Sequence, residues 1–256
     1  MQKVIEVCTQ ENVPYYIVGN GSNLLVSDQG YEGVIIQIYK QMNQVEITEN
    51  KIHAQAGALL SMIANRAMEA ELTGFEFAAG IPGTLGGACV MNAGAYGGEM
   101  KDVLETVTVL TRDGDVKTLT KDELELGYRT SVIAKKDYIV LSAVIRLENG
   151  KKEEIKAVMD DLKEKRITKQ PLEYPSAGST FKRPEGYFAG ELIQDAGLRG
   201  FQVGGAQVSE KHCGFVVNKD QATAADVMNL MNQVSDKVYE MSGVRLEPEV
   251  KRLGVF

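Results

Sequence analysis

The residues Gly19-Asn20-Gly21-Ser22-Asn23 have the composition of a phosphate-binding loop. Glycine allows unusual backbone dihedrals and close approach of a ligand, and Ser22 and Asn23 add side-chain donors. A dinucleotide-binding fingerprint would need a third glycine where Leu24 stands, and would need a helix afterwards. We therefore predict that successive backbone N–H groups in a strand–loop–strand turn hold the anion. Taken alone, the motif leaves a plain turn between strands as the alternative.

A second stretch, "AAGIPGTLGGACVMNAGAYGGEM" at 78–100, contains seven glycines. Each glycine inside a helix costs roughly 1 kcal/mol relative to alanine, so this density needs a reason. Close backbone approach to a flat, bulky ligand is one, and the apolar "ACVMNA" argues against a flexible linker. We predict that Pro82 occupies the first turn of a helix, as proline does without loss of a hydrogen bond. Together the two stretches indicate a buried cofactor with a pyrophosphate.

Composition excludes several classes of function. A net charge of −7 over 256 residues argues against binding of nucleic acid. Three cysteines without metal-type spacing and two histidines argue against a zinc site, and reduced thiols are typical of a cytoplasmic protein. No apolar run approaches the roughly 20 residues that cross a bilayer, so no membrane association is expected. The start reads as an amphipathic helix with Val4, Val7 and Cys8 on one face, which suggests that a preceding segment is missing.

The first half alternates short strands with few helices. Periodicity predicts a helix at 58–72, a hairpin around Asp113-Gly114, and a capping box at 120–123 that opens a short helix. The other apolar runs are predicted strands, namely 15–18, 23–27, 33–38, 44–48, 51–56, 103–111, 116–120 and 137–147.

The second half begins with a charged helix at 151–168, with Ile155, Val158, Met159 and Leu162 on one stripe. Further helices are predicted at 188–197, ended by Gly197, and at 223–242, between Thr223 and Gly243. The stripe of the latter comprises Val227, Leu230, Val234, Val238 and Met241. A strand at 244–255 ends the chain. Because regular β-α-β alternation is absent, we predict an α+β fold.

Five motifs in this order closely resemble the UDP-N-acetylenolpyruvoylglucosamine reductase family: "VGNGSNLLVSDQGYEGVII", "AGIPGTLGGACVMNAGAYGGEM", "GYRTSVI", "PSAGSTFKRP" and "LEPEVKRLG". The resemblance extends from about residue 3 to the C-terminus, and it is to the branch without the extra tyrosine loop. It implies an FAD-binding domain of the vanillyl-alcohol-oxidase type at 1–168, its front end truncated. A substrate-binding α+β domain would follow at 169–245, and a terminal strand at 246–256 would return toward the FAD domain.

In this family FAD takes a hydride from NADPH and passes it from N5 to the enolpyruvyl methylene carbon of a sugar nucleotide. The product is UDP-N-acetylmuramate, a peptidoglycan precursor. The resemblance therefore implies FAD as cofactor and NADPH as hydride donor. We also expect a monomer in the cytoplasm. Another flavin oxidoreductase of the same fold, or a noncatalytic nucleotide-binding fragment, stays an alternative at this point.

The resemblance assigns site residues by position. Arg129, Ser179 and Glu249 would be catalytic, with Ser179 as proton donor, and they would meet across the two domains. The implied substrate-binding residues are Tyr128, Lys182, Arg183 and His212. The implied FAD contacts are Gly19, Asn20, Gly21, Ser22, Asn23, Gly80, Ile81, Pro82, Gly83, Thr84, Gly86, Gly87, Asn92, Ala93, Gly94, Ala95 and Tyr96.

The chemistry of these residue types agrees with such roles. Hydride addition to an enol ether builds negative charge beside a carboxylate, and the planar fork of an arginine binds such a group bidentately. A serine hydroxyl is a poor acid, but it can protonate a very basic carbanion that is held in place. Without the resemblance, these residues would read as a surface arginine, a turn hydroxyl and a solvated carboxylate. Anionic ligands would need local cations, for which the candidates are Arg129, Lys182, Arg183, Arg199 and Lys211.

Overall fold

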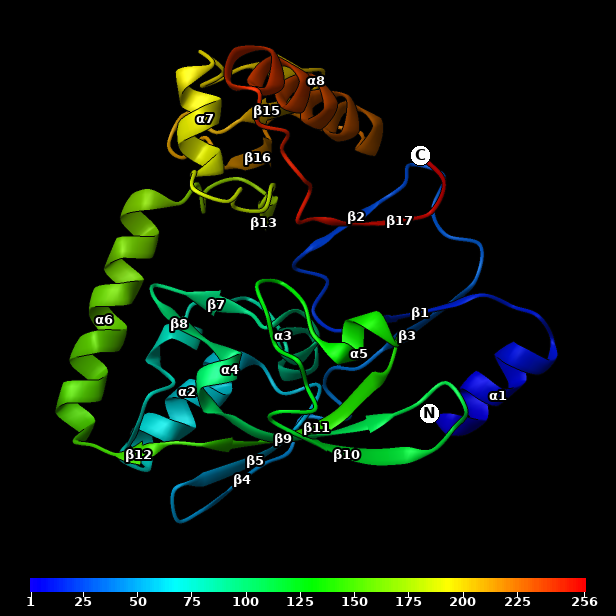
Figure 1. Cartoon of the computed structure of the whole chain (residues 1–256), viewed down its shortest axis with the longest axis vertical. Helices are drawn as coiled ribbons and strands as arrows, with labels where there is room; N and C mark the ends of the chain where they lie inside the picture. The colour runs from blue at the N-terminus through cyan, green and yellow to red at the C-terminus, as the bar shows by residue number, and fades with distance from the viewer. The chain divides into compact units, whose positions relative to one another are not determined.

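Helices and strands are mixed along the chain, which confirms the predicted α+β class (Figure 1). The computed structural model describes all 256 residues. Contacts divide them into two units. The first comprises Met1–Gly21 and Gly33–Lys165, and the second comprises Ser22–Glu32 and Arg166–Phe256. Each unit has its own hydrophobic core.

An antiparallel sheet of five strands organises the first unit, in the order β10-β9-β11-β5-β4. Its strands are β4 (Val45–Thr48), β5 (Lys51–Gln55), β9 (Leu104–Leu110), β10 (Val116–Thr120) and β11 (Ile139–Arg146). The predicted hairpin is confirmed, because Gly114 adopts φ 86° between β9 and β10. Central strand β11, which is rich in β-branched residues, pairs with β5 on one side and with β9 on the other.

Shorter elements surround this sheet. The helices are α1 (Gln2–Gln10), α2 (Leu60–Glu69), η1 (Glu76–Ala78), α3 (Leu85–Met91), α4 (Met100–Val103) and α5 (Val132–Lys135). There are three additional strand pairs. Strand β1 (Tyr15–Val18) pairs in parallel with β3 (Val34–Gln37). The antiparallel pairs are β6 (Leu72–Thr73) with β12 (Glu148–Asn149) and β7 (Gly94–Ala95) with β8 (Gly98–Glu99). The core includes Ile52, Leu60, Phe75, Leu85 and Ile145, which are all fully buried.

Three sequence predictions about helices need correction. The motif at 120–123 forms a turn and not a helix, although Glu123 accepts hydrogen bonds from the N–H and hydroxyl of Thr120, both at 2.8 Å. In α6 (Lys152–Lys169) the predicted stripe is only partly covered, with Ile155 buried, Met159 and Leu162 half-buried, and Val158 exposed. In α1 only Cys8 is buried, and Val7 is 56% exposed.

A four-stranded sheet and two helices form most of the second unit. The sheet has the order β13-β16-β15-β14, from β13 (Ser176–Ser179), β14 (Gln202–Val203), β15 (Ala206–Val208) and β16 (Phe215–Asn218). The helices are α7 (Ala189–Asp195) and α8 (Ala224–Ser242). Helix α8 has the predicted N-cap Thr223 and ends at Gly243, which adopts φ 70°. Its predicted stripe is buried at Leu230, Val234 and Val238, but Met241, in the last turn, is 65% exposed.

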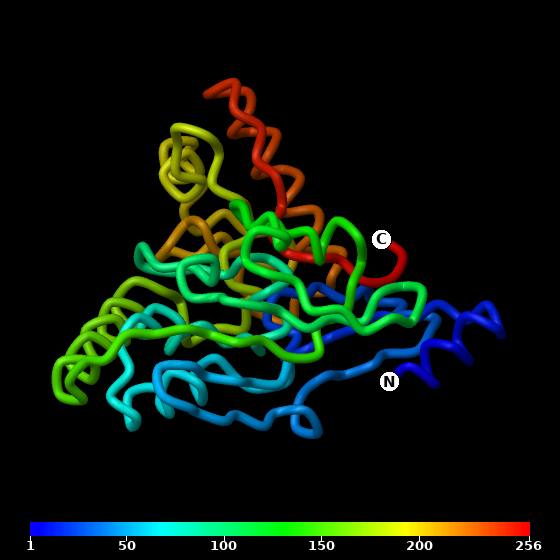
Figure 2. Tube along the Cα trace, turned by 60° about the horizontal axis from the view of Figure 1, so that its bottom comes forward, coloured from blue at the N-terminus to red at the C-terminus, as the bar shows by residue number.

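The segment 22–32 belongs to the second unit although it lies far from it in sequence. Its strand β2 (Leu24–Val26) pairs in parallel with β17 (Lys251–Leu253), and both views show the blue segment beside the red one (Figure 1 and Figure 2). The Asp28 carboxylate accepts hydrogen bonds from Ala224 N at 2.7 Å and Ala225 N at 2.9 Å. A carboxylate at a helix N-terminus is favourable, so Asp28 fastens this segment to α8. The predicted strand at 244–255 is reduced to β17.

Domain boundaries near 168 and 245 stay predictions, since the units defined by contacts separate at Lys165 and at two further points near residues 21 and 33. All three cysteines are free and buried, and burial raises the pKa of Cys89 to about 12. None of the helices combines the length and the apolar character needed to span a bilayer.

Glu105 on β9 generates a prediction about acid stability. Its carboxylate bonds Arg146 at 2.5 Å and Lys51 at 2.8 Å, and these bonds, the one from Arg146 first, lower its pKa from 4.5 to about 2. A carboxyl group with a lowered folded-state pKa stabilises the protein above its ordinary pKa and loses this effect as the pH falls toward 2. We expect the urea concentration at the unfolding midpoint to fall between pH 5 and pH 2.5 in the parent protein, and to fall less in Glu105→Gln. Glu46→Gln, which removes an exposed carboxylate on β4, is the control, and an equal effect of both would contradict the prediction.

Candidate active site

The predicted phosphate loop lies directly against the start of α3. A Cβ at Gly19 would be 2.2 Å from Oγ1 of Thr84, so only glycine allows this approach. Asn20 Nδ2 donates to the carbonyl of Pro82 at 2.6 Å. The two glycine-rich stretches, which are separated by some sixty positions in the sequence, are therefore held together by close packing and a hydrogen bond.

Beyond this contact, the loop presents unused donors. The backbone N–H groups of Asn20, Gly21, Ser22 and Asn23 make no hydrogen bond to another protein atom. Gly21 adopts φ 69°, and nothing lies within 4 Å of where its Cβ would be. A left-handed residue within a run of free amides makes the kind of concave backbone that binds anions. Such a backbone could hold a phosphate or pyrophosphate group.

The start of α3 corrects one prediction and supports another. Pro82 lies outside the helix, whose N-cap is Thr84. The amides of Leu85 and Gly86 are already bonded to the carbonyls of Ala58 and Ala56, both at 2.8 Å. Gly87, in contrast, is exposed, and the nearest atom to its hypothetical Cβ is 3.8 Å away. Gly87 is thus the helical glycine whose open face agrees with the approach of a ligand.

The glycines of the hairpin β7–β8 have a different cause. Tyr96 and Gly97, with φ of 52° and 91°, form a two-residue turn of the type that joins such strands. A Cβ at Gly98 would be 2.7 Å from the ring of Phe77, and one at Gly94 would be 2.7 Å from Gly98 O. Turn geometry and internal packing therefore explain these glycines, which sequence reasoning had attributed to a ligand. Tyr96 is exposed at the tip of the hairpin.

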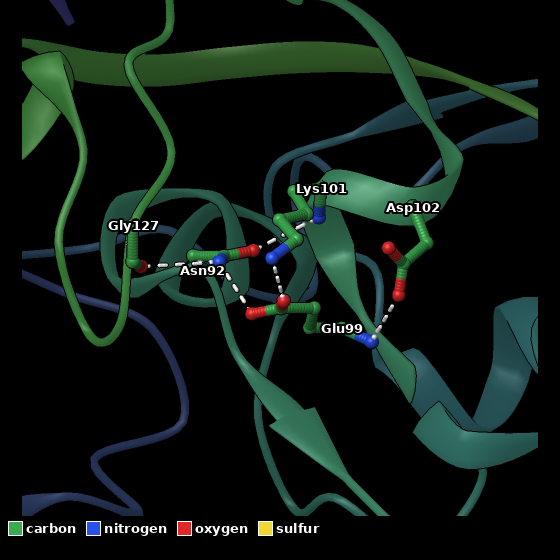
Figure 3. A network of polar contacts seen from close by, with 5 residues as sticks. All are labelled: Asn92, Glu99, Lys101, Asp102 and Gly127. Atoms are coloured by element: carbon green, nitrogen blue, oxygen red, sulfur yellow. Dashed lines mark hydrogen bonds and ion pairs between the residues drawn. The ribbon is translucent and has the colours of Figure 1, made fainter. Parts of the chain in front are cut away.

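Asn92 ends α3 in a left-handed conformation and is 0% exposed. Its Nδ2 donates to Glu99 Oε2 at 2.7 Å and to Gly127 O at 3.1 Å, and its Oδ1 accepts from Lys101 N at 2.8 Å (Figure 3). Both N–H donors of the amide are used inside the protein. The Asn92 side chain is buried and its N–H donors are used, so it has none to offer to FAD, contrary to the predicted contact.

The loop 127–130 carries Arg129. Gly127 and Thr130 exchange backbone hydrogen bonds of 3.1 and 3.2 Å, and Arg129 between them adopts φ 55°. Its guanidinium lies 5.1 Å from the ring centroid of Tyr128 and 3.5 Å from Gly94 O. Tyr128 is 52% exposed. A cation stacked at the edge of such a tight turn is well placed to receive an anionic group.

Ser179 and Glu249, the other predicted catalytic residues, both belong to the second unit. The chain after Ser179 runs antiparallel to residues 247–249, because Glu249 N donates to Thr180 O at 2.9 Å and Lys182 N to Glu247 O at 2.8 Å. Ser179 is exposed, next to the left-handed Gly178. The second unit thus brings Ser179 and Glu249 to neighbouring positions. Arg129 belongs to the first unit.

Asn23 of the phosphate loop joins this group. Its Nδ2 donates to Glu249 O at 3.3 Å, and its carbonyl accepts from Lys251 N at 3.0 Å. Thr180, which sequence reasoning missed, is buried and accepts Val216 N with its hydroxyl at 2.8 Å. The signal for it was weak, because one threonine beside a candidate serine has no distinguishing pattern.

The predicted cations differ in how they are engaged. Lys182 forms an ion pair with Glu247 at 3.1 Å, and Arg183 stacks on Phe188 with 3.8 Å to the ring centroid. Arg199 donates to Glu210 O and to Gln194, and Lys211 donates to Ile167 O at 2.7 Å. Arg199 and Lys211 therefore have structural contacts.

His212 is a packed histidine. Its Nδ1 accepts from Gly214 N at 3.0 Å, and its ring meets Phe215 edge-on at 5.0 Å. Burial is the main reason why its pKa is lowered from the ordinary value, so the ring is neutral at pH 7. It adds no positive charge for a predicted substrate contact.

Gly19 generates a prediction about ligand binding. Gly19→Ala would place a methyl group onto the Thr84 hydroxyl and push the phosphate loop away from Pro82. We expect at least a tenfold weaker binding of FAD, measured by flavin fluorescence, with the melting temperature of the ligand-free protein changed little. Gly114→Ala, in the hairpin β9–β10, is the control for a strained glycine elsewhere. Unchanged affinity in Gly19→Ala would remove the loop from the cofactor site.

Two family models match different parts of the chain. Residues 1–120 match the model of an FAD binding domain, which confirms the expected cofactor class. Residues 170–253 match the C-terminal domain of UDP-N-acetylenolpyruvoylglucosamine reductase.

Similar proteins extend over the whole chain. The UDP-N-acetylenolpyruvoylglucosamine reductase of Agathobacter rectalis is 58% identical, over 100% of this chain and 85% of that protein. That of Clostridioides difficile is 53% identical, over 99% and 84%. A crystal structure of the enzyme from Thermus caldophilus superposes with a TM-score of 0.85 at 36% identity, over 99% of this chain and 90% of that one. The chain therefore belongs to the UDP-N-acetylenolpyruvoylglucosamine reductase family.

Proposed function

We propose that this protein reduces the enolpyruvyl ether of UDP-N-acetylglucosamine to UDP-N-acetylmuramate, a peptidoglycan precursor, with FAD as cofactor and NADPH as hydride donor. The observation that carries the proposal is the run of four free amides at Asn20–Asn23, fastened to the start of α3 by Gly19 and Asn20. Family membership supplies the identity of the substrate.

The chain offers two sets of contacts for FAD. The amides of the phosphate loop would hold its pyrophosphate, and the open backbone at Gly87 would approach its ring system. When bound, FAD would carry a hydride between the two reactants: NADPH would reduce the flavin and leave as NADP⁺, and the reduced flavin would then give the hydride to the methylene carbon of the substrate.

Arg129 would bind the carboxylate of the enolpyruvyl group. Its guanidinium is always charged, and donors placed where negative charge develops stabilise the transition state. The tight turn from Gly127 to Thr130 fixes the backbone position from which the Arg129 side chain extends. Tyr128, exposed beside it, would contact the substrate.

Ser179 would hold the proton that neutralises the carbon next to the carboxylate. Its hydroxyl is exposed, and the strand β13 that carries it is bonded to β16. Glu249, whose backbone is bonded to Thr180 and Asn23, would orient this proton and help to replace it. Lys182 and Arg183 would attract the diphosphate of the nucleotide.

The wider setting is part of the same proposal. We propose a cytoplasmic monomer; the cytoplasmic location is supported by the three free cysteines, which are typical of a reducing compartment. Sedimentation of the purified protein tests the oligomeric state.

The decisive experiment separates the two half-reactions. The purified protein should be yellow with FAD, lose the flavin absorbance with NADPH under anaerobic conditions, and regain it with the enolpyruvyl sugar nucleotide. Reduction without reoxidation by this substrate would favour another flavin oxidoreductase. A colourless protein that takes up no added FAD would favour a noncatalytic nucleotide-binding protein.

Ser179→Ala is expected to leave reduction of the flavin by NADPH unchanged and to slow product formation by about 10²- to 10⁴-fold, the usual contribution of a general acid. Stopped-flow absorbance measures the first step, and chromatography of UDP-N-acetylmuramate measures the second. Ser176→Ala, three residues earlier on the same strand, is the matched control. Full turnover in Ser179→Ala would remove this serine from the mechanism.

Arg129→Ala is expected to slow reoxidation by the substrate about 10²- to 10³-fold, as loss of one charge-stabilising donor does. Binding of FAD should be nearly unchanged. Arg112→Ala, which removes an exposed arginine paired with Asp137 in the same unit, is the control. If Arg129→Ala lost its colour instead, the role of the residue would be structural.

A further inference from the structure

We infer that Asn92 is a positioning residue for Arg129, which it controls by holding the carbonyl of Gly127. The inference rests on the proposed function, because it concerns the arginine of that reaction. It assigns to Asn92 a task other than contact with FAD. The close-up in Figure 3 shows the amide between Glu99 and Gly127, on the segment that leads to the arginine.

The conformation of Arg129 needs such a support. A left-handed backbone costs a non-glycine residue roughly 1–2 kcal/mol, and Arg129 adopts φ 55°. The two backbone hydrogen bonds between Gly127 and Thr130 close the turn, but they do not attach it to the rest of the unit. Such a turn keeps its place only if neighbouring groups fix both of its ends.

Both ends of the turn are fixed by the end of α3. At the first end, Asn92 Nδ2 donates to Gly127 O at 3.1 Å. At the second, Ser131, which is fully buried, donates its hydroxyl hydrogen to Val90 O at 2.6 Å. Residues 90 and 92 therefore set the position of residues 127 and 131, with Arg129 midway between the two attachments.

Glu99 determines which way the amide of Asn92 points. With Nδ2 toward Gly127, the amide donates to two acceptors, Glu99 Oε2 and Gly127 O, while Oδ1 accepts from Lys101 N. If the amide were reversed, its oxygen would face the oxygens of Glu99 and Gly127, and its NH₂ group would face the N–H of Lys101. Glu99 is itself held by an ion pair with Lys101, and its N–H donates to Asp102 at 2.9 Å. The donor to Gly127 is consequently oriented before any ligand binds.

The first test is Asn92→Asp. This change keeps the size of the side chain and its tolerance for the left-handed backbone, but it opposes a carboxylate oxygen to Gly127 O. We expect the reoxidation of the flavin by the substrate to slow about 10- to 100-fold. The dissociation constant of FAD and the rate of reduction by NADPH should stay within about twofold of the parent. Equal slowing of both half-reactions, or loss of FAD, would overturn the inference.

A second variant separates positioning from stability. Asn92→Asp combined with Glu99→Gln exchanges the carboxylate and the amide, so that the pair can again form a hydrogen bond while Gly127 O still lacks a donor. We expect the melting temperature to recover in part compared with Asn92→Asp alone, and the slow reoxidation to persist. If reoxidation recovered together with the melting temperature, Asn92 would have only a structural role.

A third measurement distinguishes this inference from the proposed function. In the background of Arg129→Ala, Asn92→Asp should slow reoxidation no further, because its effect acts through the arginine. If Arg129→Ala slows reoxidation and Asn92→Asp alone does not, only the inference about Asn92 is wrong. If Arg129→Ala has no effect, the proposed role of the arginine fails and the inference falls with it. A full additional loss in the double variant would show that Asn92 acts independently.

Discussion

The contact between Gly19 and Thr84 is the constraint from which the rest of the candidate site follows. No side chain fits between them, since even a methyl group would lie 2.2 Å from the threonine hydroxyl. Because of this contact, the loop of free amides begins at a fixed place beside α3. The bond from Asn20 to Pro82 adds a second fixed point. A phosphate bound by the amides of Asn20 and Gly21, which belong to the same unit as α3, would therefore have a defined distance from the groups of this helix.

Helix α3 connects two parts of the candidate site in the first unit. Its seven residues span about 10 Å at roughly 1.5 Å per residue. The N-terminal end meets the phosphate loop, while the C-terminal end supports the turn that contains Arg129 through Asn92 and Val90. A rigid element of this length between an anion-binding loop and a cation can hold the two ends of an extended cofactor–substrate arrangement in register.

Sequence reasoning predicted the elements whose signals are local. The hairpin at Gly114 and helix α8 between Thr223 and Gly243 depend on residues next to them, and they were confirmed. It could not separate a glycine with open space at its Cβ position, such as Gly87, from one that is packed on a ring, such as Gly98, because that depends on distant atoms. Likewise, the amide of Asn92 acquires its role from Gly127, thirty-five residues away.

The attachment of Asp28 to α8 has a consequence for how the chain is made. The second unit requires residues 22–32 and strand β17, which are made at very different times because most of the first unit lies between them in the sequence. During synthesis, β2 must wait unpaired until β17 emerges, and the free carboxylate of Asp28 must wait for the first turn of α8. Closing such long loops is slow compared with local folding. The nascent chain therefore exposes an unpaired strand edge from the synthesis of β2 to that of β17, and it is during that interval that assistance from chaperones would matter most.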